Sequence, residues 1–200
     1  MKDATRRKTT RDAILDATDK LLTKYGYKKM TIDDLAREVS IGKGSVYLHF
    51  SSKEEIALSH IDRIVERLKV KLRTIAQKDS SVEEKLREML LERVLFRFDS
   101  AQDYARSLDE MLAVIRPALL KRRKRYFEDE AHIFAEVITM GQNSSNLIAG
   151  DPFDIARTLL SATNSLLPYS LISVEFDDRK AIRDRTAKTA ELLIRGLAAM

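Results

Sequence analysis

The sequence contains very few residues that stop a helix. Its 200 residues include only 6 glycines and 3 prolines, and the segments between them carry apolar residues at spacings of three and four. That spacing places apolar side chains on one face of an α-helix, whereas a half-buried strand would alternate them at every second residue. The two features together predict an all-α chain built from long helices.

The apolar stripes and the capping residues predict where the helices begin and end. Gly26 follows the first stripe and suits a left-handed C-cap. Thr31 and Asp34 have the spacing of a capping box at the start of the second helix. Pro117 predicts a bend or the first turn of a new helix, and Pro168 predicts a break or kink. The predicted helices cover residues 10–25, 31–39, 43–50, 51–77, 81–98, 104–115, 117–140, 152–168 and 178–197.

The later helices carry equally specific signals. Gly141 comes directly after the last periodic residue of a long stripe and predicts the end of that helix. Asp151 can cap the next helix, with Pro152 in its first position and Asp154 at N3. The body of the chain is therefore expected to be as helical as its beginning.

Patterns typical of catalysis or metal binding do not occur in this sequence. There is no cysteine, which excludes disulfides, thiolate zinc sites and cysteine nucleophiles. Neither an HExxH motif, nor a nucleophile elbow, nor a glycine-rich phosphate loop is found. No apolar run approaches a membrane span, and the first twelve residues lack the apolar core of a secretory signal. We therefore expect a cytoplasmic protein that is not an enzyme, uses no cofactor or metal, and has no membrane partner.

Positive charge is concentrated at the beginning of the chain. Residues 1–53 hold 12 Lys or Arg and 7 Asp or Glu, whereas residues 54–200 hold 24 of each kind. A small basic module followed by a larger neutral one is typical of a domain that binds a polyanion attached to a domain with another task. An excess of five charges can also arise by chance, so this asymmetry alone does not establish a polyanion-binding domain.

Residues 31–50 have the pattern of a helix-turn-helix. Two short helices are separated by Ser-Ile-Gly at 40–42, and Val46 and Phe50 are four residues apart, which predicts the buried side of the second helix. In such a unit the second helix enters the major groove of DNA, where its outward side chains reach phosphates and base edges. The residues expected to face outward are Lys43, Ser45, Tyr47 and His49.

Gly44 supports the same interpretation. Glycine costs a helix interior about 1 kcal/mol relative to alanine. A close approach of the backbone to DNA would justify that cost.

The segment MTIDDLAREVSIGKGSVYLHFSSKEEIA resembles the DNA-binding signature of the TetR/AcrR family of bacterial transcriptional regulators. The resemblance covers about residues 9–60, and its most specific part is Lys43-Gly44-Ser45-x-Tyr47-x-x-Phe50-x-x-Lys53-Glu54. It implies that Thr31 and Lys53 contact phosphates at the starts of the second and fourth helices. It also implies that the recognition helix presents Ser45, Tyr47 and His49 to DNA. The predicted DNA-binding residues are thus Thr31, Lys43, Gly44, Ser45, Tyr47, His49 and Lys53.

The chain departs from the family pattern in the turn. The family usually has glycine at position 40 and serine or threonine at position 42, whereas this chain has Ser40 and Gly42. The recognition helix is therefore expected to lack a side-chain cap.

The resemblance also implies the role of the rest of the chain. It predicts a helix-turn-helix DNA-binding domain at 1–53 and a helical effector-binding and dimerisation domain at 54–200. The last two helices would pair with their copies in a homodimer that binds a palindromic operator, and Pro168 would bend or shorten the first of them. The body would bind a largely apolar small-molecule effector, and the whole protein would be a ligand-responsive repressor. Candidate lining residues, which could equally be ordinary core, are Met89, Phe96, Met111, Phe134, Met140 and Asn164.

The same residues are also compatible with other roles. Tyr47 could pack under the fourth helix, and His49 and Lys53 could be ordinary surface residues. The basic residues Arg6, Arg7, Lys8 and Arg11 could form a disordered tail or an arm that reaches DNA. The whole chain could instead be a helical protein-interaction adaptor, or a small helical enzyme that acts on a lipid or hydrocarbon.

Overall fold

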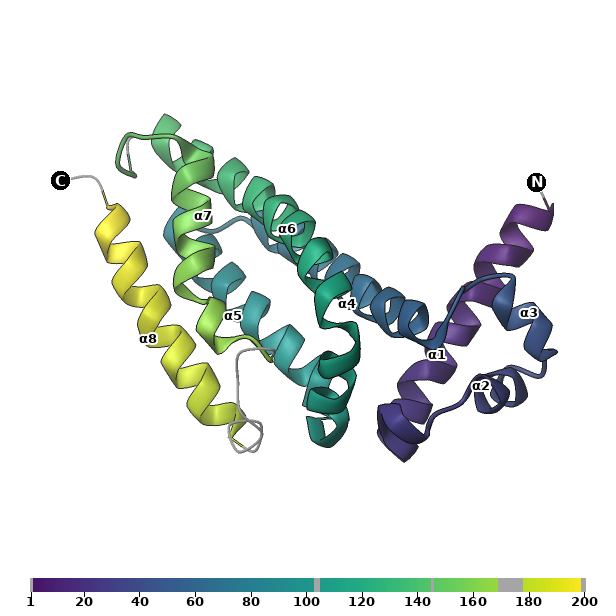
Figure 1. Cartoon of the computed structure of the whole chain (residues 1–200). Helices are drawn as coiled ribbons and strands as arrows, with labels where there is room; N and C mark the ends of the chain where they lie inside the picture. Colours follow the sequence, from purple (N-terminus) through teal and green to yellow (C-terminus); the bar gives the residue numbers. More distant parts are fainter. Residues whose placement is uncertain (1, 103–104, 145, 169–177, 199–200) are drawn as a thin grey trace. The chain divides into compact units, whose positions relative to one another are not determined.

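The computed structural model describes the backbone of residues 2–102, 105–144, 146–168 and 178–198, and side chains over 9–102, 108–144, 146–168 and 178–198. These residues are helical, apart from loops and one isolated bridge that pairs Leu147 with Ala198. The elements in chain order are α1 (Lys2–Lys29), α2 (Ile32–Glu38), α3 (Lys43–Tyr47), α4 (Lys53–Ala76), α5 (Val82–Gln102), α6 (Ala105–Asn143), α7 (Pro152–Ala162), the short 3₁₀ helix η1 (Asn164–Leu166) and α8 (Arg179–Leu197). The all-α prediction is confirmed (Figure 1).

The chain divides into two compact units, residues 1–64 with 103–120 and residues 65–102 with 121–200. We call the first the head unit and the second the body unit. The predicted boundary between residues 53 and 54 stays a prediction. No helix in the described residues is both long and apolar enough to cross a membrane.

The head unit packs α2 and α3 against α1 and the first half of α4. Figure 1 shows α2 and α3 as two short helices beside α1, the purple helix. Each of these helices contributes an apolar side chain that is at most 1 % exposed: Leu22, Leu35, Val46 and Ile56. Burial of such a side chain stabilises a fold by about 1.5–3 kcal/mol. The two short helices are therefore held by packing, because helices of this length are marginal by themselves in water.

Helix α1 is longer than predicted at both ends. It begins at Lys2 and continues past Gly26, whose φ of 74° and ψ of 168° interrupt the helical backbone. The positive φ predicted for Gly26 is confirmed, but its ψ lies outside the left-handed helical region, in a conformation that is essentially restricted to glycine. Gly26 thus forms a kink, after which a helical hydrogen bond from Met30 N to Gly26 O at 3.2 Å resumes.

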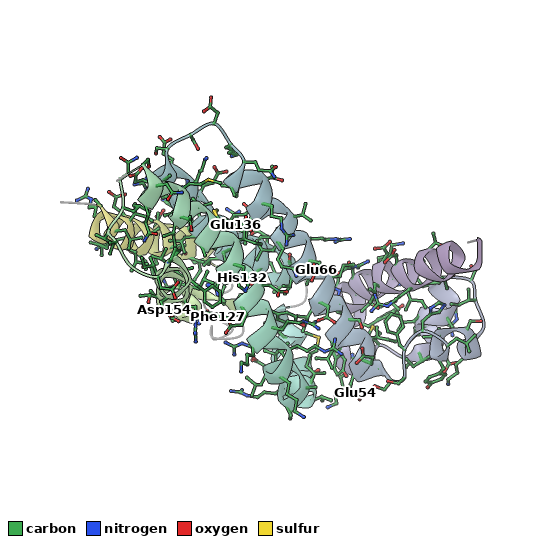
Figure 2. All side chains as sticks on the ribbon, turned by 90° about the horizontal axis from the view of Figure 1, so that it is seen from above. Glu54, Glu66, Phe127, His132, Glu136 and Asp154 are labelled. Carbon is green, nitrogen blue, oxygen red and sulfur yellow. The ribbon has the colours of Figure 1, made fainter. Side chains whose placement is uncertain are left out.

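The body unit has an apolar core drawn from α4 to α8. Leu72, Leu86, Phe134 and Leu160 are fully buried in it. Helix α8 packs along α5 (Figure 1). The ring of His132 in α6, labelled in Figure 2, stacks on Phe153 in α7 with 4.5 Å between centroids.

A buried charged group, the Arg93 cluster of Arg93, Arg97 and Glu130, lies inside this core. Arg93 Nε donates to Glu130 Oε2 at 2.8 Å, and Arg97 pairs with the same carboxylate. Arg93 and Glu130 are only 2 % and 1 % exposed. Burial alone would raise the pKa of Glu130, but the guanidinium groups of Arg97 and Arg93 outweigh it and hold the pKa below its usual value.

Neither of the two helix ends predicted within α6 is found. Pro117 lies inside α6, which runs without a break from Ala105 to Asn143. The carbonyl that loses its hydrogen bond to this proline is that of Ala113, an exposed residue, so it can reach water. Gly141 lies within the same helix and is buried. A Cβ at this position would approach Leu147 Cδ1 to 2.6 Å and Val82 Cγ1 to 2.9 Å, so a larger residue would not fit. Gly141 is therefore required by close packing and does not end the helix.

The end of α7 also differs from its prediction. The start is as expected, with Asp151 as N-cap accepting from Phe153 N at 2.9 Å and Pro152 in the first position. The helix then stops at Ala162, well before Pro168. Arg93 explains this, because Nη1 donates to Leu160 O at 3.2 Å and to Thr163 Oγ1 at 2.8 Å. The guanidinium thus occupies Leu160 O, the carbonyl that would accept a hydrogen bond from the backbone N of Asn164 in a longer helix.

Candidate nucleic-acid interface

The start of α2 is fixed by the capping box that the sequence predicts. Asp34 N donates to Thr31 Oγ1 at 3.1 Å, and Thr31 N donates to Asp34 Oδ2 at 3.1 Å. Thr31 Oγ1 also donates to Asp34 Oδ2 at 2.6 Å, and this hydrogen bond lowers the pKa of Asp34. The side chain of Thr31 is exposed, so its position at the surface is compatible with the predicted phosphate contact.

The turn between α2 and α3 contains Ser40 and Gly42, the two residues that depart from the family pattern. Ser40 has a φ of 57° and is the one non-glycine residue with positive φ in the described part of the chain. Gly42 is the N-cap of α3 and makes no side-chain capping bond. The predicted loss of the cap is confirmed. The serine occupies a conformation that glycine adopts more easily.

Helix α3 presents one buried side and one open side. Val46 and Phe50 are 0 % and 2 % exposed, as predicted. Tyr47 is 49 % exposed and does not pack under α4, and Leu48, which was not predicted to matter, is 85 % exposed. Ser45 and His49 are half-buried, and no atom lies within 4 Å of a Cβ built on Gly44.

The assigned helix α3 ends at Tyr47, whereas the sequence predicts an end at Phe50. Helical hydrogen bonds nevertheless continue, from Leu48 N to Gly44 O at 3.1 Å and from Phe50 N to Val46 O at 3.0 Å. The segment 43–50 therefore keeps the side-chain directions of a helix.

The two lysines predicted to bind phosphate have different surroundings. Lys43 Nζ pairs with Asp33 Oδ2 at 2.8 Å across α2 and α3, and this bond raises the pKa of Lys43. Lys53 Nζ lies 4.4 Å from the ring centroid of Tyr27 and donates to Lys28 O at 3.3 Å. Burial lowers the pKa of Lys53 and raises that of Tyr27 to about 12. Tyr27 is thus neutral near pH 7, and its ring can hold the ammonium group by a cation–π interaction.

A second charged group, the Arg63 cluster of Arg63, Asp16 and Asp19, ties α4 to α1 within the head unit. Arg63 donates to Asp16 Oδ1 at 2.6 Å, to Asp19 Oδ2 at 2.6 Å and to Leu15 O at 2.7 Å. The buried His60 lies one turn before Arg63, with Nδ1 at 3.2 Å from Asp19 Oδ1. The helix that carries Lys53 is therefore fixed to the helix that supports α2 and α3.

The basic N-terminal residues belong to α1. Arg6, Arg7 and Lys8 have helical backbone, which the first-helix prediction of 10–25 did not include, and their side chains lie outside the described residues. Arg11 is half-buried, with its guanidinium carbon 5.0 Å from the ring centroid of Phe50. A reach of this segment to DNA stays a prediction.

The head unit matches a known family in sequence. Residues 14–59 match the family model described as "Bacterial regulatory proteins, tetR family". This part of the chain is similar to the TetR family. The matched range contains the capping box of α2, the turn, all of α3 and the start of α4, so the TetR match and the predicted interface coincide.

Curated relatives are similar over a part of the chain. An uncharacterised HTH-type transcriptional regulator in the lacX 3'region of Lactococcus lactis subsp. lactis is 39 % identical over 84 residues, which are 42 % of this chain and 43 % of that protein. The IcaR negative transcriptional regulator of the biofilm operon icaADBC from Staphylococcus aureus (strain Newman) is 44 % identical over 46 residues, 23 % of this chain and 25 % of IcaR. The chain thus spans less than half the length of these relatives, both of which are named as transcriptional regulators.

Solved structures are similar over nearly the whole chain. A TetR-family transcriptional regulator from Pectobacterium atrosepticum has a TM-score of 0.76 at 20 % identity and covers 98 % of this chain and 97 % of that one. A structure described as "Molecular basis for control of antibiotic production by a bacterial hormones" has a TM-score of 0.67 at 26 % identity, covering 96 % and 98 %. The TetR fold therefore extends through the body unit, where sequence similarity is weak.

The candidate effector residues occupy several environments. Met89 and Phe134 are fully buried in the body core, and Phe96 packs against it. Asn164 accepts a hydrogen bond from Arg93 Nη2 at 2.8 Å, and Met140 is 50 % exposed. Met111 belongs to the head unit and is buried there. Their role in binding an effector stays a prediction.

Proposed function

We propose that this protein is a transcriptional regulator that binds duplex DNA through α2 and α3. The observation that carries the proposal is the coincidence of the TetR match at 14–59 with an exposed α3 surface on a firmly packed head unit. In this arrangement α3 enters the major groove, while Thr31 and Lys53 flank it at the starts of α2 and α4.

The contacts in the head unit suggest how each side chain would act. Tyr47 offers a hydroxyl at the open side of α3 and can bond to a phosphate or a base edge. Lys43 would exchange its exposed ion pair with Asp33 for a phosphate, at low cost, since exposed pairs contribute about 0–1 kcal/mol. Lys53 is held in one orientation by Tyr27 and Lys28 O, which would reduce the entropy lost on binding.

The regulator would act as a homodimer joined through α7 and α8, with two α3 segments about 34 Å apart, or one further turn, on a roughly palindromic operator. Leu192 of α8 is 64 % exposed, which leaves an apolar side chain available to a second copy. A C₂ pair of identical subunits matches the symmetry of such an operator.

The body unit would bind a largely apolar small molecule, and this binding would lower the affinity of the protein for DNA. The protein would then be a ligand-responsive repressor. IcaR is named a negative regulator, and the antibiotic-control structure is described in terms of a bacterial hormone. Release of DNA requires that the effector binds the low-affinity state more tightly than the DNA-bound state.

Selection of bound sequences from random duplex DNA tests the central proposal. A selected palindrome should bind wild type with an affinity that falls steeply with salt, because phosphate contacts release counterions. The double variant Tyr47→Ala with Lys53→Ala should lose at least tenfold in affinity, while Tyr25→Ala, which truncates a tyrosine 42 % exposed on α1, serves as the matched control. No selected sequence, or undiminished affinity of the folded double variant, would disprove the proposal.

The dimer and the effector need separate measurements. Sedimentation of the protein with the selected duplex should give two chains per operator, and Leu192→Glu should shift the free protein toward monomer. A panel of apolar ligands is then titrated against the protein–DNA complex, and a true effector raises the dissociation constant. A single chain per operator would disprove the dimer without affecting DNA binding itself.

A further inference from the structure

Leu48 is the most exposed of the large hydrophobic side chains in the described residues, at 85 %. Its neighbours in the same segment, Val46 and Phe50, are almost completely buried. A single exposed leucine is ordinary on a protein surface. Leu48 is unusual because it lies in the candidate DNA-binding helix, among polar side chains and beside Gly44, which has no side chain.

Helical geometry places Leu48 at the centre of the open side of α3. Successive side chains are rotated by about 100° in an α-helix, and Leu48, with a φ of −68° and a ψ of −21° and its N bonded to Gly44 O, follows that rotation. Leu48 then points about 180° away from the midpoint of Val46 and Phe50. Tyr47 lies about 100° to one side of this direction. Leu48, and not Tyr47, therefore occupies the part of the helix farthest from the head core.

Gly44 leaves room beside Leu48. The two residues are four apart and share a face, and nothing lies within 4 Å of a Cβ built on Gly44. A helix that enters the major groove with this face forward brings Leu48 to the base edges before the polar side chains that flank it. Leucine has no donor or acceptor, so it can contribute to base reading only through apolar contact.

The major groove offers one apolar group to such a side chain, the C5-methyl of thymine. We propose that Leu48 is a specificity-determining residue that reads a thymine methyl group in each half-site of the operator. This inference rests on the proposed function, because it requires α3 to enter the groove. It adds a base preference that comes from an apolar contact, whereas the expected polar residues read or position DNA by hydrogen bonds.

Replacement of single thymines by deoxyuridine removes the methyl group and leaves base pairing intact. Each thymine in one half-site of the selected duplex is replaced in turn, and dissociation constants are measured for wild type, Leu48→Ala and Leu48→Met. Leu120→Ala is the matched control, since Leu120 is a leucine of α6 that is 50 % exposed. Circular dichroism of each variant verifies that the helices are intact.

At one thymine position, wild type should lose about fourfold in affinity on removal of the methyl group, which corresponds to about 0.8 kcal/mol for a buried methyl. Leu48→Ala should bind the thymine duplex about as weakly as wild type binds the deoxyuridine duplex, and should show no further loss. Leu48→Met should retain the methyl dependence, and Leu120→Ala should behave as wild type.

Two results would overturn this inference while leaving DNA binding established. One is that wild type is indifferent to deoxyuridine at every thymine of the half-site. The other is that Leu48→Ala shows the same methyl dependence as wild type at every position. If no duplex is selected at all, the proposed function fails first and the inference fails with it.

Discussion

The head unit and the body unit each contain an arginine that forms ion pairs with another helix, but the two clusters differ in their contact with water. In the Arg63 cluster, the carboxylates of Asp16 and Asp19 are 62 % and 44 % exposed. In the Arg93 cluster, Glu130 is 1 % exposed and Arg93 is 2 % exposed. The chemistry of the ion pair is the same in both units, and only the surroundings differ.

This difference determines what a broken bond would cost. When a partner is removed from a buried pair, the remaining charge has no water to solvate it, and the loss is typically about 3–5 kcal/mol. When the carboxylates already face water, removal of the arginine leaves them solvated, and exposed pairs are worth about 0–1 kcal/mol each. We infer that the Arg93 cluster is essential to folding of the body unit, whereas the Arg63 cluster fixes α4 to α1 at modest energy.

The largest expected effect is that of Glu130→Ala. It leaves the buried Arg93 and the partly buried Arg97 without their carboxylate, and should lower the free energy of unfolding by about 3–5 kcal/mol. Urea denaturation followed by circular dichroism measures the loss. Glu88→Ala is the control, because Glu88 pairs with Lys78 at the surface with 46 % of its side chain exposed. A loss below about 1 kcal/mol for Glu130→Ala would remove the distinction between the clusters.

The stability of the Arg93 cluster should also depend on pH, because Glu130 must be ionised to pair with the arginines. Its folded-state pKa is lowered, so its contribution to stability is complete above the unfolded value of about 4.3 and is lost as pH falls through the folded value. The melting temperatures of wild type and Glu130→Gln should therefore differ most above the unfolded pKa, and converge as the pH falls from there through the lowered folded pKa. A difference that grows as the pH falls would contradict this assignment.

Arg63→Met should have a smaller effect. It removes the bonds to two exposed carboxylates and to Leu15 O while keeping the apolar stem, and should cost about 1–2 kcal/mol. High salt should reduce the difference from wild type, because exposed charges are screened. A loss as large as that of Glu130→Ala, independent of salt, would show that the Arg63 cluster also behaves as a buried one.

The smallest effects are expected in the turn of the head unit, where no ion pair is involved. Ser40→Gly should stabilise by about 1 kcal/mol, because it relieves a left-handed backbone. Gly42→Ser should add about 0.5–1 kcal/mol by capping α3, and the space for its side chain is free. Thermal unfolding measures both, with Gly196→Ser as a control at another open glycine. A fall in melting temperature for either turn variant would contradict these assignments.

The features predicted correctly from sequence depend on residues close together in the chain. The capping box of Thr31 and Asp34, the N-cap Asp151 and the missing cap at Gly42 are each decided within four residues. The burial of Val46 and Phe50 follows from helical spacing alone. Local rules of this kind were sufficient to place α2, the turn and α3.

Two of the wrong predictions have long-range causes. Gly141 was read as a helix end, but its role is set by Leu147 and Val82. The end of α7 was assigned to Pro168, but it is set by Arg93, about 70 positions away in sequence. Such partners become neighbours only after folding, so no local pattern reveals them.

The most exposed residue of the candidate site was missed for another reason. The resemblance directs attention to the polar residues of α3, and Leu48 is a hydrophobic residue in a helix whose other large apolar side chains are buried. A count of helical angles relative to Val46 and Phe50 would have identified it from the sequence.

The bonds from Arg93 to Leu160 O and Thr163 have a practical consequence for anyone who wishes to isolate the proposed pairing region. The terminator of α7 is supplied by α5, so an excised peptide covering residues 151–198 would lack the side chain that stops its first helix. Such a peptide should extend or fray at Thr163 and should not reproduce the native segment. Any minimal version of this region must begin before α5.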